Sequence, residues 1–267
     1  MKVFIGADIE GVAGLSVFAE SYMTDVARYN HFAKQMSEEV AAACRGAFKA
    51  GATGVTVKDA HNDGRNITID LLPEKAKLIS GVTNTPWSMI GGIDNSYNYL
   101  MFIGYHDAAN CSTNPTSHTL SSTKIKEMRI NGEYASEFLI FAYAGAYLGI
   151  PTVFLSGDDG IANRAKRFSK DMVTYSTKIG FGNSVESVHP KVAIENIEKL
   201  VEEALSGDLS RHKFELPEKF ELEVQYFRHF EALRNCFYPG ANLEGTDTVR
   251  FETDDYYEVL RFLHFTI

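Results

Sequence analysis

The sequence predicts an α/β fold, with a largely parallel sheet flanked by helices and a smaller C-terminal α+β portion. Over the first two hundred residues, short apolar strand-like runs alternate with segments whose apolar residues recur at helical spacing, which is typical of a parallel sheet with crossover helices. Beyond about residue 207, alternating and aromatic segments take over. We therefore assign residues 1–207 to an α/β core. Residues 208–267 are expected to complete the fold or make oligomer contacts, after a linker at 207–217.

The first elements form a strand–helix–strand unit. Residues 2–7, KVFIGA, read as a short buried strand, and residues 29–50 carry apolar side chains at helical spacing before Gly51. A glycine directly after the last periodic residue is a common end of a helix. Residues 53–61 are rich in β-branched side chains, which favour a second strand.

The remaining elements follow from the same patterns. We predict strands at 76–81, 99–106, 151–159 and 218–227, a hairpin over 124–134, and helices over 134–148 and 189–207. The hairpin contains Asn131-Gly132, the residue pair that a type I′ turn favours. The last helix has Pro190 in its first turn and Gly207 at its end, as the preferences of helix termini require.

Composition limits the classes of partner. The 267 residues are 45% hydrophobic and 23% charged, with a net charge of −9, which argues against a nucleic-acid or anionic membrane surface. No apolar run is long enough to span a bilayer. Three widely spaced cysteines, Cys44, Cys111 and Cys236, form neither a disulfide framework nor a metal knuckle. We expect reduced thiols and a cytoplasmic protein with no nucleic-acid or membrane partner.

Side chains of metal-ligand type follow four predicted strands: Asp8 and Glu10, Asp59 and His61, His106, and Asp158 and Asp159. The carboxyl ends of parallel strands share one rim of the sheet, where ligands bind. Residues two apart on extended chain point the same way, so Asp8 and Glu10 can converge on one point. A divalent cation between these two carboxylates would remove their repulsion.

Helix capping is the alternative explanation for each of these acids. An acid after a strand often caps the next helix, and Asp158 and Asp159 read as the capped start of the helix DDGIANRAKRF. Four separate caps would not favour a mixture of two carboxylates and two imidazoles. That mixture is offered by Asp8, Glu10, His61 and His106. It suits Zn²⁺ best, with Mn²⁺ or Fe²⁺ possible and Mg²⁺ or Ca²⁺ less suitable.

Three further residues have two readings each. His118 lies in NPTSHTLSS, a loop rich in turn and hydroxyl residues, and is either an exposed histidine or a functional residue at the rim. Glu133 and Glu137 lie four residues apart at the start of a predicted helix and can share one face. Acids are also favourable at a helix N-terminus without any ligand. The residues alone leave open which glutamate, if either, binds metal.

An ordered set of segments resembles the zinc-dependent D-aminopeptidases encoded beside bacterial dipeptide-transport genes. The matching segments are DIEGVAG at 8–14, VKDAHNDGRN at 57–66, LISG at 78–81, FIGYHDAA at 102–109, SHT at 117–119, INGEYASE at 130–137 and VFLSGDD at 153–159. They run in the order of the family and cover most of the chain. Beyond about residue 205 the resemblance is carried by YPGANLEGTDTVRFE at 238–252.

This resemblance implies two zinc ions per chain, with Asp8 bridging both. Glu10 and His106 would complete one zinc site, and His61 and Glu137 the other. His118 matches the catalytic histidine of the family. The family also forms stacked rings around an inner chamber, which implies a large homo-oligomer, a stacked-ring decamer.

The expected function is therefore that of a metallo-aminopeptidase, a hydrolase that removes an N-terminal residue, with a D-residue implied by the family, from short peptides or amino-acid amides. One alternative is a two-metal hydrolase of another class, such as a phosphoesterase. The sequence shows no clustered Arg/Lys clamp beside the proposed ligands, which weighs against phosphate. Another alternative is a non-catalytic metal- or ligand-binding protein. An open site beside His118 weighs against it, because structural zinc sites are usually closed.

Overall fold

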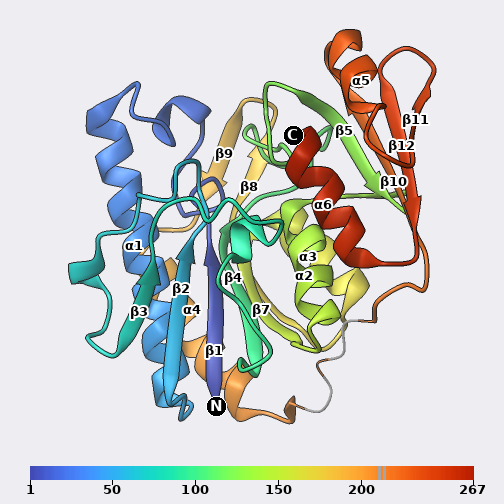
Figure 1. The fold of residues 1–267 in the computed structure, drawn as a ribbon. Coiled ribbons are helices and arrows are strands. Elements are labelled where there is room, and N and C mark those ends of the chain that lie inside the picture. Colours follow the sequence, from blue (N-terminus) through green and yellow to red (C-terminus); the bar gives the residue numbers. More distant parts are fainter. Residues whose placement is uncertain (210–211, 213–214) are drawn as a thin grey trace.

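A computed structural model describes residues 1–209, 212 and 215–267, and it contains two sheets (Figure 1). The larger sheet has the strand order β3-β2-β1-β4-β7-β8-β9, and all its pairs are parallel except β8 with β9. Its strands are β1 (Lys2–Ala7), β2 (Gly54–Asp59), β3 (Ala76–Ile79), β4 (Tyr99–Tyr105), β7 (Thr152–Asp158), β8 (Val173–Phe181) and β9 (Ser184–Ser187). This largely parallel sheet confirms the predicted α/β fold class.

The smaller sheet is antiparallel and has the order β11-β12-β10-β5-β6. Its strands are β5 (Ile125–Ile130), β6 (Glu133–Tyr134), β10 (Phe220–Tyr226), β11 (Ala241–Glu244) and β12 (Thr248–Thr253). The C-terminal strands thus extend the hairpin β5–β6, with Leu222 opposite Ile130. The division after residue 207 stays a prediction, and residues 210–211 and 213–214 of the expected linker lie outside the described residues.

Helices cover both faces of the larger sheet (Figure 1). They are α1 (Val26–Lys49), α2 (Glu137–Tyr147), α3 (Asp159–Phe168), α4 (Pro190–Ser206), α5 (His229–Asn235) and α6 (Tyr256–Thr266), with short 3-10 turns η1 (Phe18–Glu20), η2 (Ile69–Leu71) and η3 (Ser88–Ile90). One apolar core joins α1 and α4 to the sheet. A second core joins α2 and α6 to the other face and to the antiparallel sheet.

Local sequence signals explain where several elements begin and turn. Asn131 and Gly132 both have positive φ, 52° and 79°, which confirms the predicted type I′ hairpin. The helix predicted from residue 134 begins at Glu137, because the Ser136 hydroxyl accepts a hydrogen bond from the Leu139 amide at 3.1 Å and caps it. Asp158 caps α3, as predicted, by accepting from the Ile161 amide at 2.9 Å.

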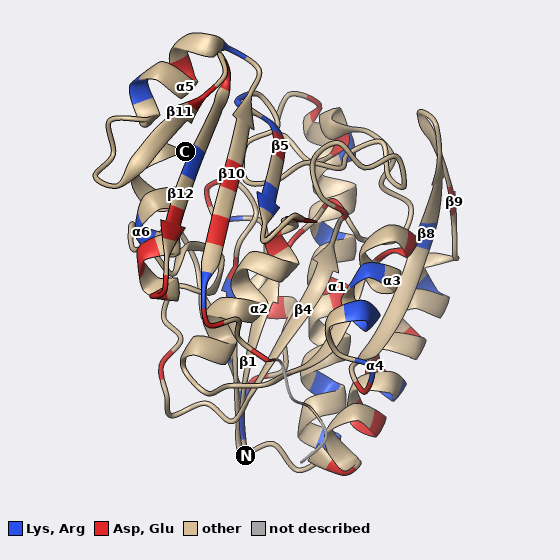
Figure 2. Cartoon of the chain, turned by 90° about the vertical axis from the view of Figure 1, so that its right-hand side faces the viewer, with Lys and Arg blue, Asp and Glu red and all other residues tan. Residues whose placement is uncertain are grey.

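The outward face of the antiparallel sheet is charged. Along β10 buried and partly exposed residues alternate, so the apolar side chains face the core. Acidic and basic residues both lie on β5 and β12, and β10 carries acidic residues (Figure 2). Arg250 pairs with Glu221 at 2.6 Å and with Glu252 at 3.0 Å. Among the described residues, the helices are too short or too polar to cross a bilayer.

Two glycines bring the end of β1 onto β4. The Gly11 amide donates to the Gly104 carbonyl at 2.7 Å, and a Cβ on Gly11 would lie 1.8 Å from the Tyr105 carbonyl oxygen. Gly104 itself has a φ of +75° and a carbonyl oxygen of Asp8 2.2 Å from where its Cβ would be. Only glycine fits such close contacts. They place the residues that follow β1 directly beside those that follow β4.

Candidate metal centre

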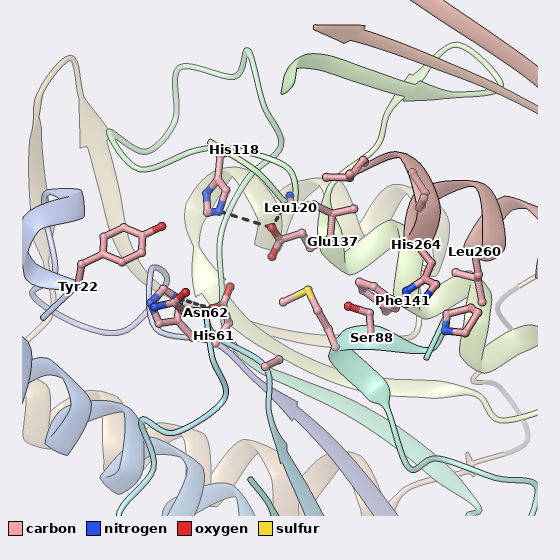
Figure 3. Close-up of a pocket in the computed structure, with 16 residues that line it drawn as sticks. Tyr22, His61, Asn62, Ser88, His118, Leu120, Glu137, Phe141, Leu260 and His264 are labelled. Carbon is pink, nitrogen blue, oxygen red and sulfur yellow. Dashed lines mark hydrogen bonds and ion pairs between the residues drawn. The ribbon is translucent and has the colours of Figure 1, made fainter. Parts of the chain in front are cut away.

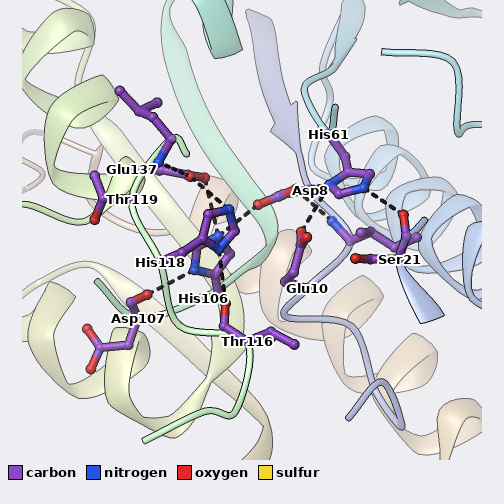
Figure 4. A network of polar contacts seen from close by, with 12 residues as sticks. Asp8, Glu10, Ser21, His61, His106, Asp107, Thr116, His118, Thr119 and Glu137 are labelled. Carbon is purple, nitrogen blue, oxygen red and sulfur yellow. Dashed lines mark hydrogen bonds and ion pairs between the residues drawn. The ribbon is translucent and has the colours of Figure 1, made fainter. Parts of the chain in front are cut away.

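Five predicted ligands meet in one buried cluster at the carboxyl ends of β1, β2 and β4 (Figure 4). They are Asp8, Glu10, His61, His106 and Glu137, each at most 5% exposed. Asp8 lies at the centre, with one carboxylate oxygen 3.3 Å from His61 Nδ1 and the other 3.4 Å from His106 Nε2. Ligand-type atoms from distant parts of the chain therefore converge around one carboxylate.

The contacts divide this cluster into two groups on either side of Asp8. His61 Nδ1 lies 3.0 Å from Glu10 Oε2, and His106 Nε2 lies 3.3 Å from Glu137 Oε2. The resemblance implied the other grouping, with Glu10 beside His106 and Glu137 beside His61. Ligand atoms of Asp8, Glu10 and His106 do lie within 4.8 Å of one another, but the shortest contacts favour His61 with Glu10 and His106 with Glu137.

Backbone carbonyls fix which nitrogen of each histidine ring donates away from the carboxylates. His61 Nε2 donates to the Ser21 carbonyl at 2.8 Å, and His106 Nδ1 donates to the Asp107 carbonyl at 2.9 Å. A carbonyl only accepts, so the other nitrogen of each neutral ring carries a lone pair toward the carboxylates. Metal-binding histidines are commonly oriented by such an outer hydrogen bond.

The cluster contains polar atoms that are buried without a hydrogen bond. These atoms are Asp8 Oδ2, both carboxylate oxygens of Glu10, and His106 Nε2. Burial, and next the charge of Glu10, raise the pKa of Asp8 to about 7. Leaving such acceptors unpaired is costly. A divalent cation would satisfy these oxygen and nitrogen donors together, so the residues present fit a zinc-type centre.

His118 lies at the edge of this cluster, on the loop after β4. Its Nδ1 donates to the Thr116 carbonyl at 2.9 Å, and its Nε2 lies 3.6 Å from Glu137 Oε1. Burial, and next the charge of His106, lower the pKa of His118. The residue is 8% exposed and lines the adjoining cavity, so it is not the exposed loop histidine of the alternative reading.

Glu133 and the other strand-end acids lie outside the cluster. Glu133 is exposed on β6. The Asp59 carboxylate accepts from the Asn66 amide at 2.6 Å, from Asn66 Nδ2 at 2.8 Å and from the Ile67 amide at 2.8 Å. Asn66 Nδ2 also donates to the His61 carbonyl at 2.7 Å. Asp59 therefore shapes the loop that presents His61.

Two buried ionisable residues make hydrogen bonds to the backbone of the loop after β1. The Lys178 ammonium, on β8, donates to the carbonyls of Glu10 and Leu15. The Glu39 carboxylate, on α1, accepts from the Ala13 amide at 2.9 Å. The roles of Lys178 and Glu39 could not be predicted from the sequence, because neither residue lies near the ligands along the chain and β8 was not predicted.

A cavity of about 350 Å³ opens beside the cluster (Figure 3). Its polar wall contains Asp8, His61, His118 and Glu137. Tyr22 lies on the other side of the opening, with its hydroxyl directed into the cavity. The metal-ligand side chains are thus reachable from a space large enough for a small peptide.

Comparison with known proteins identifies the family of this chain. Residues 1–265 match the family model Peptidase_M55, described as D-aminopeptidase. A D-aminopeptidase of Bacillus subtilis is 28% identical over 97% of this chain and 93% of its own length. The solved structure of the Zn-dependent D-aminopeptidase DppA from Bacillus subtilis, a self-compartmentalizing protease, is similar with a TM-score of 0.90 and 26% identity, covering 100% of this chain and 96% of that one.

The match extends over both sheets and over every proposed ligand. The chain belongs to the D-aminopeptidase family and is a metallo-aminopeptidase, a hydrolase of peptide bonds.

Proposed function

We propose that this chain is a two-zinc aminopeptidase that removes an N-terminal D-residue from short peptides or amino-acid amides. The observation that carries the proposal is the buried cluster around Asp8, whose unpaired donor atoms adjoin both His118 and the cavity. Its preference for D-residues and its use of zinc are supported by the family and by the Zn-dependent relative.

Asp8 would be shared by both ions in this proposal. One ion would be held with Glu10 and His61, and the other with His106 and Glu137, following the shortest contacts. When bound, two zinc ions polarise a scissile carbonyl and lower the pKa of a water molecule. The free α-amine of a substrate would coordinate one of these ions or meet a nearby carboxylate.

His118 is the proposed acid/base. Its Nδ1–H is fixed on the Thr116 carbonyl, so Nε2 carries the lone pair at the cavity wall. Because its pKa is lowered, the ring is neutral near pH 7 and can take a proton from the attacking water. The same Nε2 would return this proton to the leaving amine. A covalent histidine adduct trapped in a single turnover would overturn this role in favour of a nucleophile.

One experiment tests the activity and the metal together. Purified protein is loaded with zinc, its zinc content per chain is measured, and hydrolysis of D-alanyl and L-alanyl amides is compared. We expect two zinc ions per chain and faster hydrolysis of the D-amide. Hydrolysis of a phosphate ester in place of both amides would favour the phosphoesterase alternative. Against that alternative, no lysine or arginine is among the described residues that line the cavity.

We further propose that the chain forms a homo-oligomer, a stacked-ring decamer. Support comes from the self-compartmentalizing relative and from apolar side chains that α5 and the residues after it expose. Phe230 and Leu233 are each 50% exposed and Phe237 is 80% exposed. Contiguous exposed apolar residues commonly mark a protein interface. The cytoplasmic location stays a prediction.

A further inference from the structure

The cavity beside the metal ligands has two chemically different ends. Away from the metal ligands the lining is mainly apolar and includes Pro86, Met89, Leu120, Phe141, Leu260 and Leu263, with Ser88, His264 and Ile267 also lining the cavity. The first six come from the η3 region, the loop after β4, and the helices α2 and α6. In Figure 3 Phe141 and Leu260 lie beyond Glu137, on the side away from Tyr22, with Ser88 and His264 near them.

The apolar wall is preformed. Phe141 is 2% exposed, Leu260 1%, Leu263 6% and Met89 7%, and all four belong to the core between α2 and α6. Side chains packed in this way hold the shape of the space between them. An apolar side chain placed against this wall would be favoured, because it would bury apolar surface.

A second cavity adjoins the first. Its volume is about 590 Å³, and it is lined by Phe18, Tyr22, Leu120, Ser121, Ser122 and Thr123. Tyr22 and Leu120 line both cavities. The hydroxyl groups of the second cavity can donate to and accept from peptide groups, so this side suits the continuing backbone of a substrate.

We propose that the apolar end of the first cavity holds the side chain of the substrate's N-terminal residue, and that the second cavity receives the chain after the scissile bond. This inference rests on the proposed aminopeptidase activity. The enzyme then prefers N-terminal residues with apolar side chains of the size of leucine or phenylalanine. Alanine fills little of the apolar end, and glutamate places a charge there.

The test compares substrates that share one leaving group. The zinc-loaded full chain is assayed on the p-nitroanilides of D-alanine, D-leucine, D-phenylalanine and D-glutamate, with the L-forms alongside. We expect kcat/KM for D-leucine to exceed that for D-alanine at least about tenfold, and D-glutamate to be slowest. If D-alanine is cleaved as well as D-leucine, the pocket assignment is wrong although the aminopeptidase activity stands.

Binding of the free amino acids distinguishes failure of the proposed aminopeptidase function from failure of the pocket assignment. If no anilide or amide is hydrolysed, the proposed function fails, and calorimetry with free D-leucine and D-alanine then decides the pocket on its own. Tighter binding of D-leucine upholds an apolar side-chain site. Equal binding of the two amino acids, or no binding of D-leucine, overturns it.

A pair of variants on α6 tests whether the apolar wall determines the preference for D-leucine over D-alanine. Leu263→Ala removes part of the apolar wall, and Phe265→Ala, on the same helix at a position 65% exposed, is the matched control. We expect Leu263→Ala to reduce the D-leucine/D-alanine ratio of kcat/KM at least about threefold, and Phe265→Ala to leave it unchanged. The ratio is independent of how much protein is folded. If Leu263→Ala yields no folded protein, Met89→Ala tests the same wall, and an unchanged ratio in it contradicts the proposal.

Discussion

The imidazole ring of His118 stacks on that of His106, with 4.2 Å between the ring centroids and 10° between the ring planes. Two imidazoles at this separation resist carrying positive charge together. A charge on His106, or a cation beside it, therefore keeps His118 neutral. The ring next to the ligands thus maintains its neighbour in the form that accepts a proton.

His118→Ala should retain zinc but lose most activity. The proposed ligand groups around Asp8 do not include its ring, although His118 lies close to His106 and Glu137, whereas a positioned acid/base commonly contributes about 10²–10⁴-fold. Zinc per chain and kcat on a D-alanyl amide are measured for the variant. Ser117→Ala is the control, because the buried Ser117 hydroxyl has no hydrogen-bond partner. Loss of zinc together with activity would identify His118 as a ligand.

Asp8→Asn should remove both zinc ions, because the two carboxylate oxygens of Asp8 face the two ligand groups. An amide offers one weak oxygen donor and no negative charge. Glu10→Gln provides the comparison, and we expect it to lower zinc content by one per chain. Metal analysis after dialysis gives both values. An Asp8→Asn protein that keeps two zinc ions would exclude a bridging carboxylate.

Asn66→Ala should weaken zinc binding from outside the ligand set. Asn66 links the Asp59 carboxylate to the His61 carbonyl and accepts from the Tyr29 hydroxyl at 2.8 Å. Loss of such outer contacts commonly lowers metal affinity by about 10–100-fold. Zinc affinity is measured by competition with a chelator. Asp63→Ala, on the exposed part of the same loop, should leave it unchanged, and equal affinities in both variants would refute the positioning role.

Glu39→Gln should remove a pH-dependent loss of stability. Burial is the main cause that raises the pKa of Glu39 from 4.5 to about 7. The folded state binds this proton more tightly than the unfolded state does. Protonation of Glu39 therefore stabilises the folded state fully below pH 4.5, and this stabilisation is lost as the pH rises through 7. The loss is at most about 3 kcal/mol. Glutamine keeps an oxygen for the Ala13 amide.

Urea denaturation between pH 4.5 and 8 measures this difference. The free energy of unfolding of the wild type should fall relative to Glu39→Gln across that range. Parallel curves for the two proteins would show that Glu39 ionises without cost.

Phe230→Asp should reduce the size of the assembly. This side chain is half exposed on α5, and an aspartate there would carry a charge into an apolar interface. Sedimentation velocity reports the size, and Phe181→Asp, at an exposed position of β8 far along the chain, is the control. If only the control dissociates, α5 does not form the interface.

Sequence patterns predicted that several residues of the buried cluster lie together. Asp8, His61 and His106 could be placed together because the ends of parallel strands lie on one rim. Glu137 needed the family resemblance, since its position depends on where α2 begins. The Ser136 cap starts the helix at Glu137 and leaves Glu133 in the hairpin. A shift of three residues in this helix start decides which glutamate is buried.

Hydrophobic patterns in the sequence could not predict the buried residues that make hydrogen bonds to the loop after β1. Lys178 reaches a carbonyl 168 residues away along the chain, and Glu39 reaches an amide 26 residues away. Buried polar contacts of this kind have no periodicity, so hydrophobic patterning does not reveal them. The strands β8 and β9 were missed for a related reason, because most of their residues are only partly buried.

The proposed metal ligands and part of the apolar wall come from different ends of the chain. Every proposed metal ligand lies within the first 137 residues, while part of the apolar wall comes from α6 at residues 256–266. Mutations in the last helix can therefore change which substrates fit without altering a single ligand. In this chain the proposed selectivity and the proposed chemistry therefore depend on different segments. Exchange of α6 between relatives is a direct route to new specificities.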